Sequence, residues 1–287
     1  MTYKPFDLSG KVALVTGGNG GIGLGMAEAL AASGADVAIW GTNEEKNAKA
    51  SETLKAHGVK VYARKVNVAD EMQVIEGINA TVEAMGRIDT AIANAGVGYG
   101  APSFLEMTTE TYRKTLAVNL DGVFWTLRES ARHMVDRAKN GDPGGSLVGI
   151  ASLAAIEGAA RNEAYAATKG GVISMIKSVA VEFARYGVRA NAILPGWIAT
   201  DMTSGMQDST VFAEKVIPRV PIRRWGEPED FGGMAVYLAS DAAAYHTGTT
   251  TVTYRGATRR RRAGGVAPTW LGLGLGLGLG LGLGLGL

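Results

Sequence analysis

The chain has 287 residues, no cysteine and a formal net charge of +2, so disulfides, cysteine-ligated zinc and thiol catalysis are excluded. Its length suits one large α/β domain with an ample core. The charge is uneven: residues 255–287 hold five arginines and no acid, so residues 1–254 carry 24 basic and 27 acidic side chains, a net of −3. This mildly acidic body gives no reason to expect nucleic-acid binding.

Short apolar runs and amphipathic runs alternate along the chain. We expect strands near 11–16, 36–40, 59–64, 88–93, 145–150 and 188–193. We expect helices at about 21–33, 43–57, 70–85, 109–137 and 163–186. This order predicts a single Rossmann-type domain of the α/β class, a doubly wound parallel sheet with helices on both faces. Ligand sites on such sheets lie beyond the carboxyl ends of the strands.

A glycine-rich loop, TGGNGGIG at residues 16–23, stands between the apolar run Val12 to Val15 and the amphipathic run Leu24 to Ala32. Its glycines permit positive φ and a close approach of backbone to a pyrophosphate, and the helix that follows offers free N–H groups. By itself such a loop is also a tight strand-to-helix connection. Its position after the first strand of a β/α chain favours dinucleotide binding.

A second cluster suggests an enzyme. Ser152 follows the expected strand at 145–150, and Tyr165 and Lys169 stand four residues apart, so that on a helix they share one face. A lysine ammonium beside a phenol favours the phenolate and lowers the pKa of the tyrosine toward the range useful for acid–base catalysis. Ser152 can donate a hydrogen bond to an oxygen on which charge develops. Pairs of Tyr and Lys at this spacing also occur on ordinary surface helices.

Taken in order, the glycine loop, Asn94-Ala95-Gly96, Asn119, Ser152, the Tyr165/Lys169 pair and Pro195-Gly196 resemble the short-chain dehydrogenase/reductase family over roughly residues 6–254. The resemblance implies an NAD(P)-dependent oxidoreductase. It implies hydride transfer between the nicotinamide and a carbonyl or carbinol carbon, without a metal. The four catalytic residues that it implies are Asn119, Ser152, Tyr165 and Lys169.

In this resemblance Tyr165 exchanges a proton with the substrate oxygen, and Ser152 polarises that oxygen. Lys169 lowers the pKa of Tyr165 and holds the nicotinamide ribose, while Asn119 holds a water that connects the lysine to solvent. The cofactor-binding residues implied are Gly17, Asn19, Gly21, Ile22, Gly23, Thr42, Asn43, Asn67, Val68, Asn94, Ala95, Gly96, Tyr165, Lys169, Pro195, Gly196, Ile198 and Thr200.

The end of the second expected strand bears on the choice of cofactor. The run Trp40 to Asn43 carries no acid that could bind a free adenosine 2′-OH, which favours NADP(H). The basic residue that many NADP-dependent relatives carry in the glycine loop is replaced here by Asn19 or Gly20, so NAD(H) stays open. Thr42, Asn43 and Lys46 are the candidates for holding a 2′-phosphate.

The substrate is expected to be a small carbonyl compound or alcohol. The overall pattern is most like that of 3-oxoacyl-carrier-protein reductases, and a sugar or polyol dehydrogenase, such as a glucose dehydrogenase, is the alternative. A catalytically silent NAD(P)-binding regulator on the same fold is a further alternative, which the presence of both Tyr165 and Lys169 disfavours. The resemblance also implies a homo-oligomer, a dimer or a tetramer.

The remaining segments suggest no further site. The three histidines stand far apart and form no metal-ligand spacing, so no metal is expected. Lys4 is followed by Pro5, Phe6 and Asp7 rather than by a secretory signal, and we expect a cytoplasmic protein without membrane attachment. The domain is taken to end at 254. Residues 255–287, four consecutive arginines and then a Leu-Gly repeat, are expected to be a disordered low-complexity tail.

Overall fold

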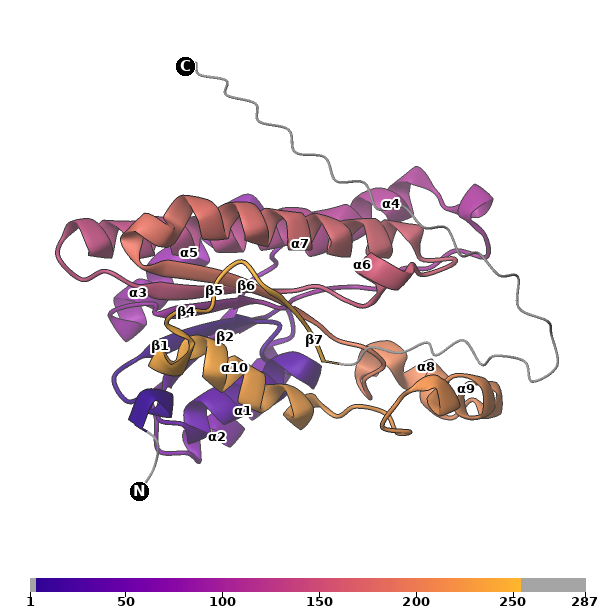
Figure 1. Cartoon of the computed structure of the whole chain (residues 1–287), viewed down its shortest axis with the longest axis horizontal. Helices are drawn as coiled ribbons and strands as arrows, with labels where there is room; N and C mark the ends of the chain where they lie inside the picture. The colour runs from indigo at the N-terminus through magenta and orange to yellow at the C-terminus, as the bar shows by residue number, and fades with distance from the viewer. Residues whose placement is uncertain (1–3, 254–287) are drawn as a thin grey trace, which may run out of the picture. The chain divides into compact units, whose positions relative to one another are not determined.

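A computed structural model describes residues 4–253 of the chain (Figure 1). Its centre is a parallel seven-stranded sheet with the order β3-β2-β1-β4-β5-β6-β7. The strands are β1 Val12–Thr16, β2 Asp36–Gly41, β3 Val61–Lys65, β4 Thr90–Ala93, β5 Gly145–Ile150, β6 Val188–Leu194 and β7 Thr250–Val252. The strand order reverses between β1 and β4, which is where such sheets open a crevice for ligands.

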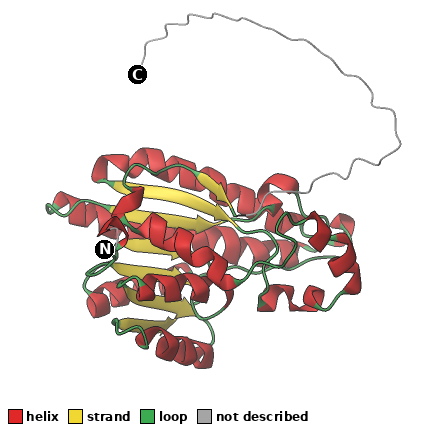
Figure 2. Cartoon of the chain, turned by 60° about the horizontal axis from the view of Figure 1, so that its bottom comes forward, coloured by secondary structure: helices red, strands yellow, loops and turns green. Residues whose placement is uncertain are grey.

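Helices cover both faces of the sheet (Figures 1 and 2). In Figure 1, α5 and α7 lie above the sheet, and α1, α2 and α10 lie below it. The longer helices are α1 Gly21–Ala32, α2 Glu44–Lys55, α3 Glu71–Met85, α4 Thr109–Leu116, α5 Gly122–Lys139, α7 Glu163–Phe183 and α10 Gly232–Ala239. Short helices α6 Ala154–Glu157, α8 Ser204–Gln207 and α9 Thr210–Lys215 lie beyond the carboxyl ends of the strands.

The central strands of the sheet are buried on both faces, and the edge strands β3 and β7 are half-buried. Every residue of β1 and of β4 is buried. One apolar cluster forms under α3, α5 and α7, and another under α1, α2 and α10. Trp40 fills the first cluster, and its indole N–H donates to Thr81 Oγ1 at 3.1 Å. Burial on both faces explains why these strands read as continuous apolar runs rather than as alternating ones.

The predicted fold class is confirmed, and the six expected strands are present with shifts of a residue or two at their ends. The single helix expected at 109–137 is wrong. A π-helical turn at Ala117–Asp121 separates α4 from α5, because an extra residue in this turn lets Asn119 reach the backbone after β4. The helix expected to run to 186 ends at Phe183 and continues as a 3₁₀ turn.

Three further features were not among the expected elements. Helix α10 packs on α1, and β7 pairs in parallel with β6 from Ala192↔Thr250 to Leu194↔Val252. The segment 200–225, which we call the lid, holds α8 and α9. Its two ends are joined, since Ala199 N donates to Gly226 O at 2.8 Å and Gly226 N donates to Trp197 O at 2.9 Å.

The expected low-complexity tail at 255–287 lies outside the described residues. Across residues 4–253, none of the helices combines the length and the apolar character needed to cross a membrane.

Candidate active site

The glycine loop joins β1 to α1 beneath the end of β2. Gly17 and Gly21 have φ values of 64° and 50°, in the left-handed region that side chains disfavour. A Cβ on Gly23 would lie 2.2 Å from Gly17 O, so this position requires glycine as well. A Cβ on Gly20 would meet no atom within 4 Å, so the loop is open on its outer side, where a phosphate could approach it.

Thr16 and Asn94 tie the loop to β4. Thr16 Oγ1 accepts hydrogen bonds from the N–H groups of Asn94 and Ala95, each at 3.0 Å. Asn94 Nδ2 donates to Thr16 O at 2.9 Å and to Gly17 O at 3.3 Å. Asn94 and Ala95 are thus fixed against the end of β1 and the start of the glycine loop. Thr16 belongs to the same network but is not among the predicted site residues, although it is the first residue of the glycine-rich run TGGNGGIG.

Asn119 is fully buried in the π turn. Its Oδ1 accepts from Val97 N and its Nδ2 donates to Val97 O, both at 2.8 Å. A Cβ on Gly96 would lie 3.4 Å from Asn119 Oδ1 and 3.5 Å from Lys169 Nζ, so Gly96 is packed between the two side chains. Asn119 therefore lies close to Lys169, with Gly96 between them. The water-holding role implied for it stays a prediction, and the contacts described are with Val97.

Ser152, Tyr165 and Lys169 come together at the carboxyl end of β5. Lys169 is 3 % exposed, and its Nζ donates to Ile150 O at 2.8 Å. The same Nζ lies 5.5 Å from the centroid of the Tyr165 ring. The Tyr165 side chain is hydrogen-bonded to the Ser152 side chain. Helix α7 presents Tyr165 and Lys169 one turn apart, and the strand end supplies Ser152.

Burial dominates the electrostatics of this group. It raises the pKa of the Tyr165 phenol, and the hydrogen bond with Ser152 opposes that rise. Burial also lowers the pKa of Lys169 to about 8. The expected lowering of the pKa of Tyr165 by Lys169 is not found, because Nζ is bonded to the Ile150 carbonyl rather than to the phenol.

The loop after β6 closes the other side of the crevice. Pro195 is buried, and its carbonyl accepts from Leu153 N at 3.0 Å, which fixes the chain just after Ser152. Ile198 is buried, and Gly196 is half-buried between the two. A Cβ on Gly21 would lie 3.2 Å from Thr200 Cγ2, so the start of the lid rests on the glycine loop.

The residues predicted for the adenosine end lie at the ends of β2 and β3. Thr42 and Asn43 are exposed, and Asn43 Oδ1 caps α2 by accepting from Lys46 N at 2.9 Å. Lys46 Nζ is 2.6 Å from Asp201 Oδ2, so this candidate for a phosphate contact is shared with a lid carboxylate. At β3, Asn67 is exposed and Val68 is buried against Gly122.

The groups at these strand ends therefore fit a dinucleotide by their chemistry. They are an open glycine cradle at a helix N-terminus, an amide-lined floor, and a lysine beside the reactive phenol. Ile22 stands in the first turn of α1, behind the cradle. Within residues 4–253 no group of three or more His, Asp or Glu side chains is placed to hold a metal ion.

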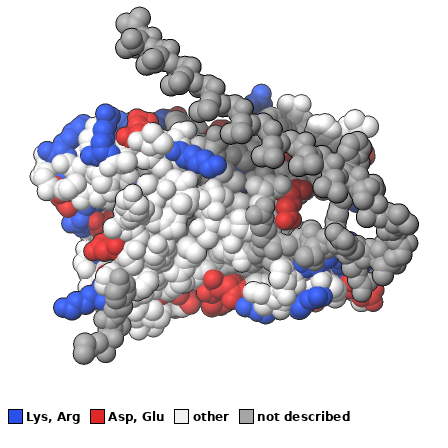
Figure 3. Space-filling view, viewed as in Figure 1, with Lys and Arg blue, Asp and Glu red and all other residues white. Residues whose placement is uncertain are grey.

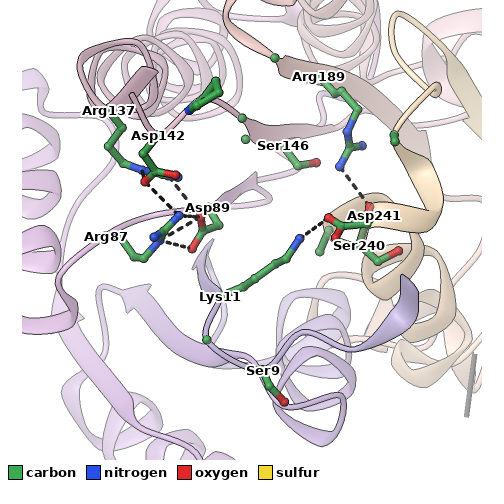
Figure 4. Close-up of a pocket in the computed structure, with 17 residues that line it drawn as sticks. Ser9, Lys11, Arg87, Asp89, Arg137, Asp142, Ser146, Arg189, Ser240 and Asp241 are labelled. Atoms are coloured by element: carbon green, nitrogen blue, oxygen red, sulfur yellow. Dashed lines mark hydrogen bonds and ion pairs between the residues drawn. The ribbon is translucent and has the colours of Figure 1, made fainter. Parts of the chain in front are cut away.

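A cavity of about 470 Å³ lies at the opposite edge of the sheet, where the strands begin (Figure 4). Arg87 and Arg137 bind Asp89 there, and Lys11 binds Asp241. Arg189 donates to the carbonyls of Leu238 and Ser240. These cations neutralise carboxylates and helix C-termini, so we assign the cluster to stability rather than to catalysis.

Comparisons with known proteins agree with this site. The sequence model of a family described as enoyl-(acyl carrier protein) reductase matches residues 17–258. The chain is 37% identical over 244 residues to L-rhamnose 1-dehydrogenase (NAD(P)(+)) of Azotobacter vinelandii, covering 83% of this chain and 93% of that one. It is 35% identical to the 3-oxoacyl-[acyl-carrier-protein] reductase of Chlamydia pneumoniae, covering 88% and 98%.

Among solved structures, a gluconate 5-dehydrogenase from Burkholderia cenocepacia in complex with NADP and tartrate superposes with a TM-score of 0.81 at 33% identity, covering 86% of this chain and 95% of that one. The glycine cradle, the Ser152–Tyr165–Lys169 group and these likenesses together show that the chain belongs to the short-chain dehydrogenase/reductase family of NAD(P)-dependent oxidoreductases, enzymes that act on CH–OH groups.

Proposed function

We propose that the protein interconverts a ketone and a secondary alcohol, and that its physiological reaction is the reduction of a 3-oxoacyl-type ketone with NADP(H). The observation that carries the reaction type is the placement of Ser152, Tyr165 and Lys169 at the strand ends beside the glycine cradle. Oxidation of a sugar or polyol is the second candidate, which the likeness to L-rhamnose 1-dehydrogenase supports.

A bound nicotinamide cofactor supplies the hydride chemistry. The cradle at Gly17, Gly21 and Gly23 would hold its pyrophosphate against the N-terminus of α1. In the direction of reduction, Tyr165 gives its phenolic proton to the substrate oxygen, and Ser152 donates a hydrogen bond to the same oxygen. Because burial raises the pKa of Tyr165, the phenol stays protonated at neutral pH and is ready to act as the acid.

Apolar side chains around the site support an acyl substrate. Ile156, Met202 and Met206 are exposed on α6 and on the lid. Met202 also lies against the loop after β4, since a Cβ on Gly98 would be 3.4 Å from its sulfur. A largely apolar entrance suits an acyl chain better than it suits a sugar with several hydroxyl groups.

We further propose a cytoplasmic homo-oligomer. Phe124 on α5 and Val181 on α7 are apolar side chains with exposed fractions of 43% and 84%. The middle of the face shown in Figure 3 is also nearly free of charged side chains, which gather toward its rims. Surfaces of this kind suit closed, isologous packing of identical chains.

The direct test is a panel assay that follows NADPH and NADH oxidation with 3-oxoacyl thioesters, simple ketones and keto sugars, and the reverse reaction with polyols. We expect turnover with the thioesters, at least as fast with NADPH as with NADH. Turnover confined to sugars or polyols would favour the second candidate. Cofactor binding without turnover of any substrate would point to a regulator.

A further inference from the structure

Two amide side chains meet at the end of β2, where the adenosine ribose of a dinucleotide would lie. Asn19, from the glycine loop, donates through Nδ2 to Asn47 Oδ1 at 2.7 Å. Asn47, on the inner side of α2, is 5% exposed. It donates in turn to Gly41 O at 3.0 Å and to Arg64 O at 3.3 Å.

These partners determine how both amides are oriented. Because Gly41 O and Arg64 O are acceptors, they must face the NH₂ group of Asn47, and its carbonyl oxygen must face Asn19. Asn19 must then present an N–H to that oxygen. The backbone carbonyls of Gly41 and Arg64 therefore hold Asn47 in one orientation, and Asn47 in turn holds Asn19.

Gly41 is part of the same arrangement. A Cβ at this position would lie 2.0 Å from Asn19 Nδ2 and 2.5 Å from Asn47 Oδ1. The Asn19 amide thus crosses directly over Gly41, and any side chain there would push it away. The missing acid at the end of β2 consequently has a steric reason, independent of the charge of the cofactor.

The Asn19 amide is uncharged and can still both donate and accept a hydrogen bond. Asn47 uses one N–H of Asn19, so the second N–H and the carbonyl oxygen of Asn19 are not taken up by Asn47. A ribose 2′-OH can donate to the oxygen, and a 2′-phosphate can accept from the N–H. The run Trp40 to Asn43 supplies no carboxylate that would repel the phosphate, and the charge of Lys46 is offset by its ion pair with Asp201 of the lid.

We infer that Asn47 is a positioning residue that holds Asn19 over Gly41, and that this amide pair makes the ribose end accept NADH and NADPH alike. The inference rests on the proposed NAD(P)-dependent function. It predicts dissociation constants for the two cofactors that lie within about tenfold of each other, since a neutral amide discriminates by no more than one hydrogen bond.

The test is a double-mutant cycle read by fluorescence titration of NADH and of NADPH, with no substrate present. Asn19→Ala and Asn47→Leu should each weaken the binding of both cofactors by about threefold to tenfold, the loss of one hydrogen bond. The double variant should bind no more weakly than Asn19→Ala, because Asn47 acts through Asn19. Ser51→Ala, one turn further along α2, is the matched control and should leave both constants unchanged.

Gly41→Ala provides a second route, because its Cβ pushes the Asn19 amide away from Asn47 Oδ1 without replacing either asparagine. It should reproduce the loss even if Asn47→Leu fails to fold. Additive losses in the cycle, or unchanged binding in Gly41→Ala, would overturn the inference. So would a preference of the unaltered protein well above about tenfold for one cofactor. If the unaltered protein bound neither cofactor, the proposed function itself would fail.

Discussion

Asn119 holds Val97 at both ends of its side-chain amide, accepting from the backbone N–H and donating to the backbone carbonyl at 2.8 Å each. The two residues belong to different elements: Asn119 to the π turn between α4 and α5, and Val97 to the loop after β4. The paired bonds mimic one rung of a strand ladder. They fix the loop that carries Gly96 beside Lys169.

Replacing Asn119 with Leu should therefore affect stability and turnover together. The change leaves both polar groups of Val97 without their partner, which costs about 2 kcal/mol when the loop retains some access to water. Urea denaturation measures this loss, and the steady-state rate should fall with it as the loop moves. Asn119→Asp keeps only the acceptor, so its stability should lie between those of the unaltered protein and Asn119→Leu. Unchanged stability in Asn119→Leu would contradict the proposed anchoring.

Tyr165→Phe should abolish turnover while leaving cofactor affinity nearly unchanged. The phenol acts in proton transfer, which typically contributes about 10²- to 10⁴-fold to the rate. Steady-state assays measure the rate, and NADPH titration together with thermal melting checks that the site and the fold survive. Retention of more than about a tenth of the activity would remove Tyr165 from the acid–base role.

His133 should make the folded state sensitive to acid. Its Nε2 accepts a hydrogen bond from Ile88 N at 3.1 Å, which requires an unprotonated nitrogen. Burial first, and then Arg137 and Arg87, lower its pKa, whereas Asp89 and Asp136 oppose this. The unfolded chain therefore takes up the proton first as the pH falls, and stability declines below the ordinary histidine pKa of about 6.5.

The variant His133→Gln isolates this effect, because a glutamine offers a neutral acceptor at every pH. Free energies of unfolding from urea titrations should show the unaltered protein losing stability relative to His133→Gln as the pH is lowered from about 7 to about 5. Parallel pH profiles for the two proteins would show that His133 does not titrate between the folded and unfolded states.

The tail should be dispensable for cofactor binding. Truncation after Gly256 keeps β7, whose pairing with β6 ends at Val252, and removes four consecutive arginines. We expect unchanged cofactor affinity and a dimer formed through α4, α5 and α7, with the tetramer weakened in the full chain because like charges meet where tails approach. Light scattering measures the oligomeric state, and NADPH titration measures the cofactor affinity. Loss of the fold, or of a membrane association that the full chain shows, would mean that the tail is functional.

The sequence alone was enough to identify the fold class and to single out Tyr165 and Lys169 as a pair on one face of a helix. Strands buried on both faces must be continuous apolar runs, and a loop that approaches a phosphate closely must contain glycine. Both features are therefore visible in short stretches of the sequence. The spacing of Tyr165 and Lys169 is likewise a property of one helix. Helix ends and most strand ends were found to within a few residues for the same reason.

Only the tertiary structure decided what depends on residues far apart in the chain. The π turn places Asn119 within hydrogen-bonding distance of the Val97 backbone. The Asn19–Asn47 pair joins the glycine loop to α2 across Gly41. Lys169 turns to the Ile150 carbonyl, and burial rather than its charge dominates the pKa of Tyr165. Such contacts follow from how the elements pack. Helical or strand periodicity does not predict which distant backbone group a buried side chain will contact.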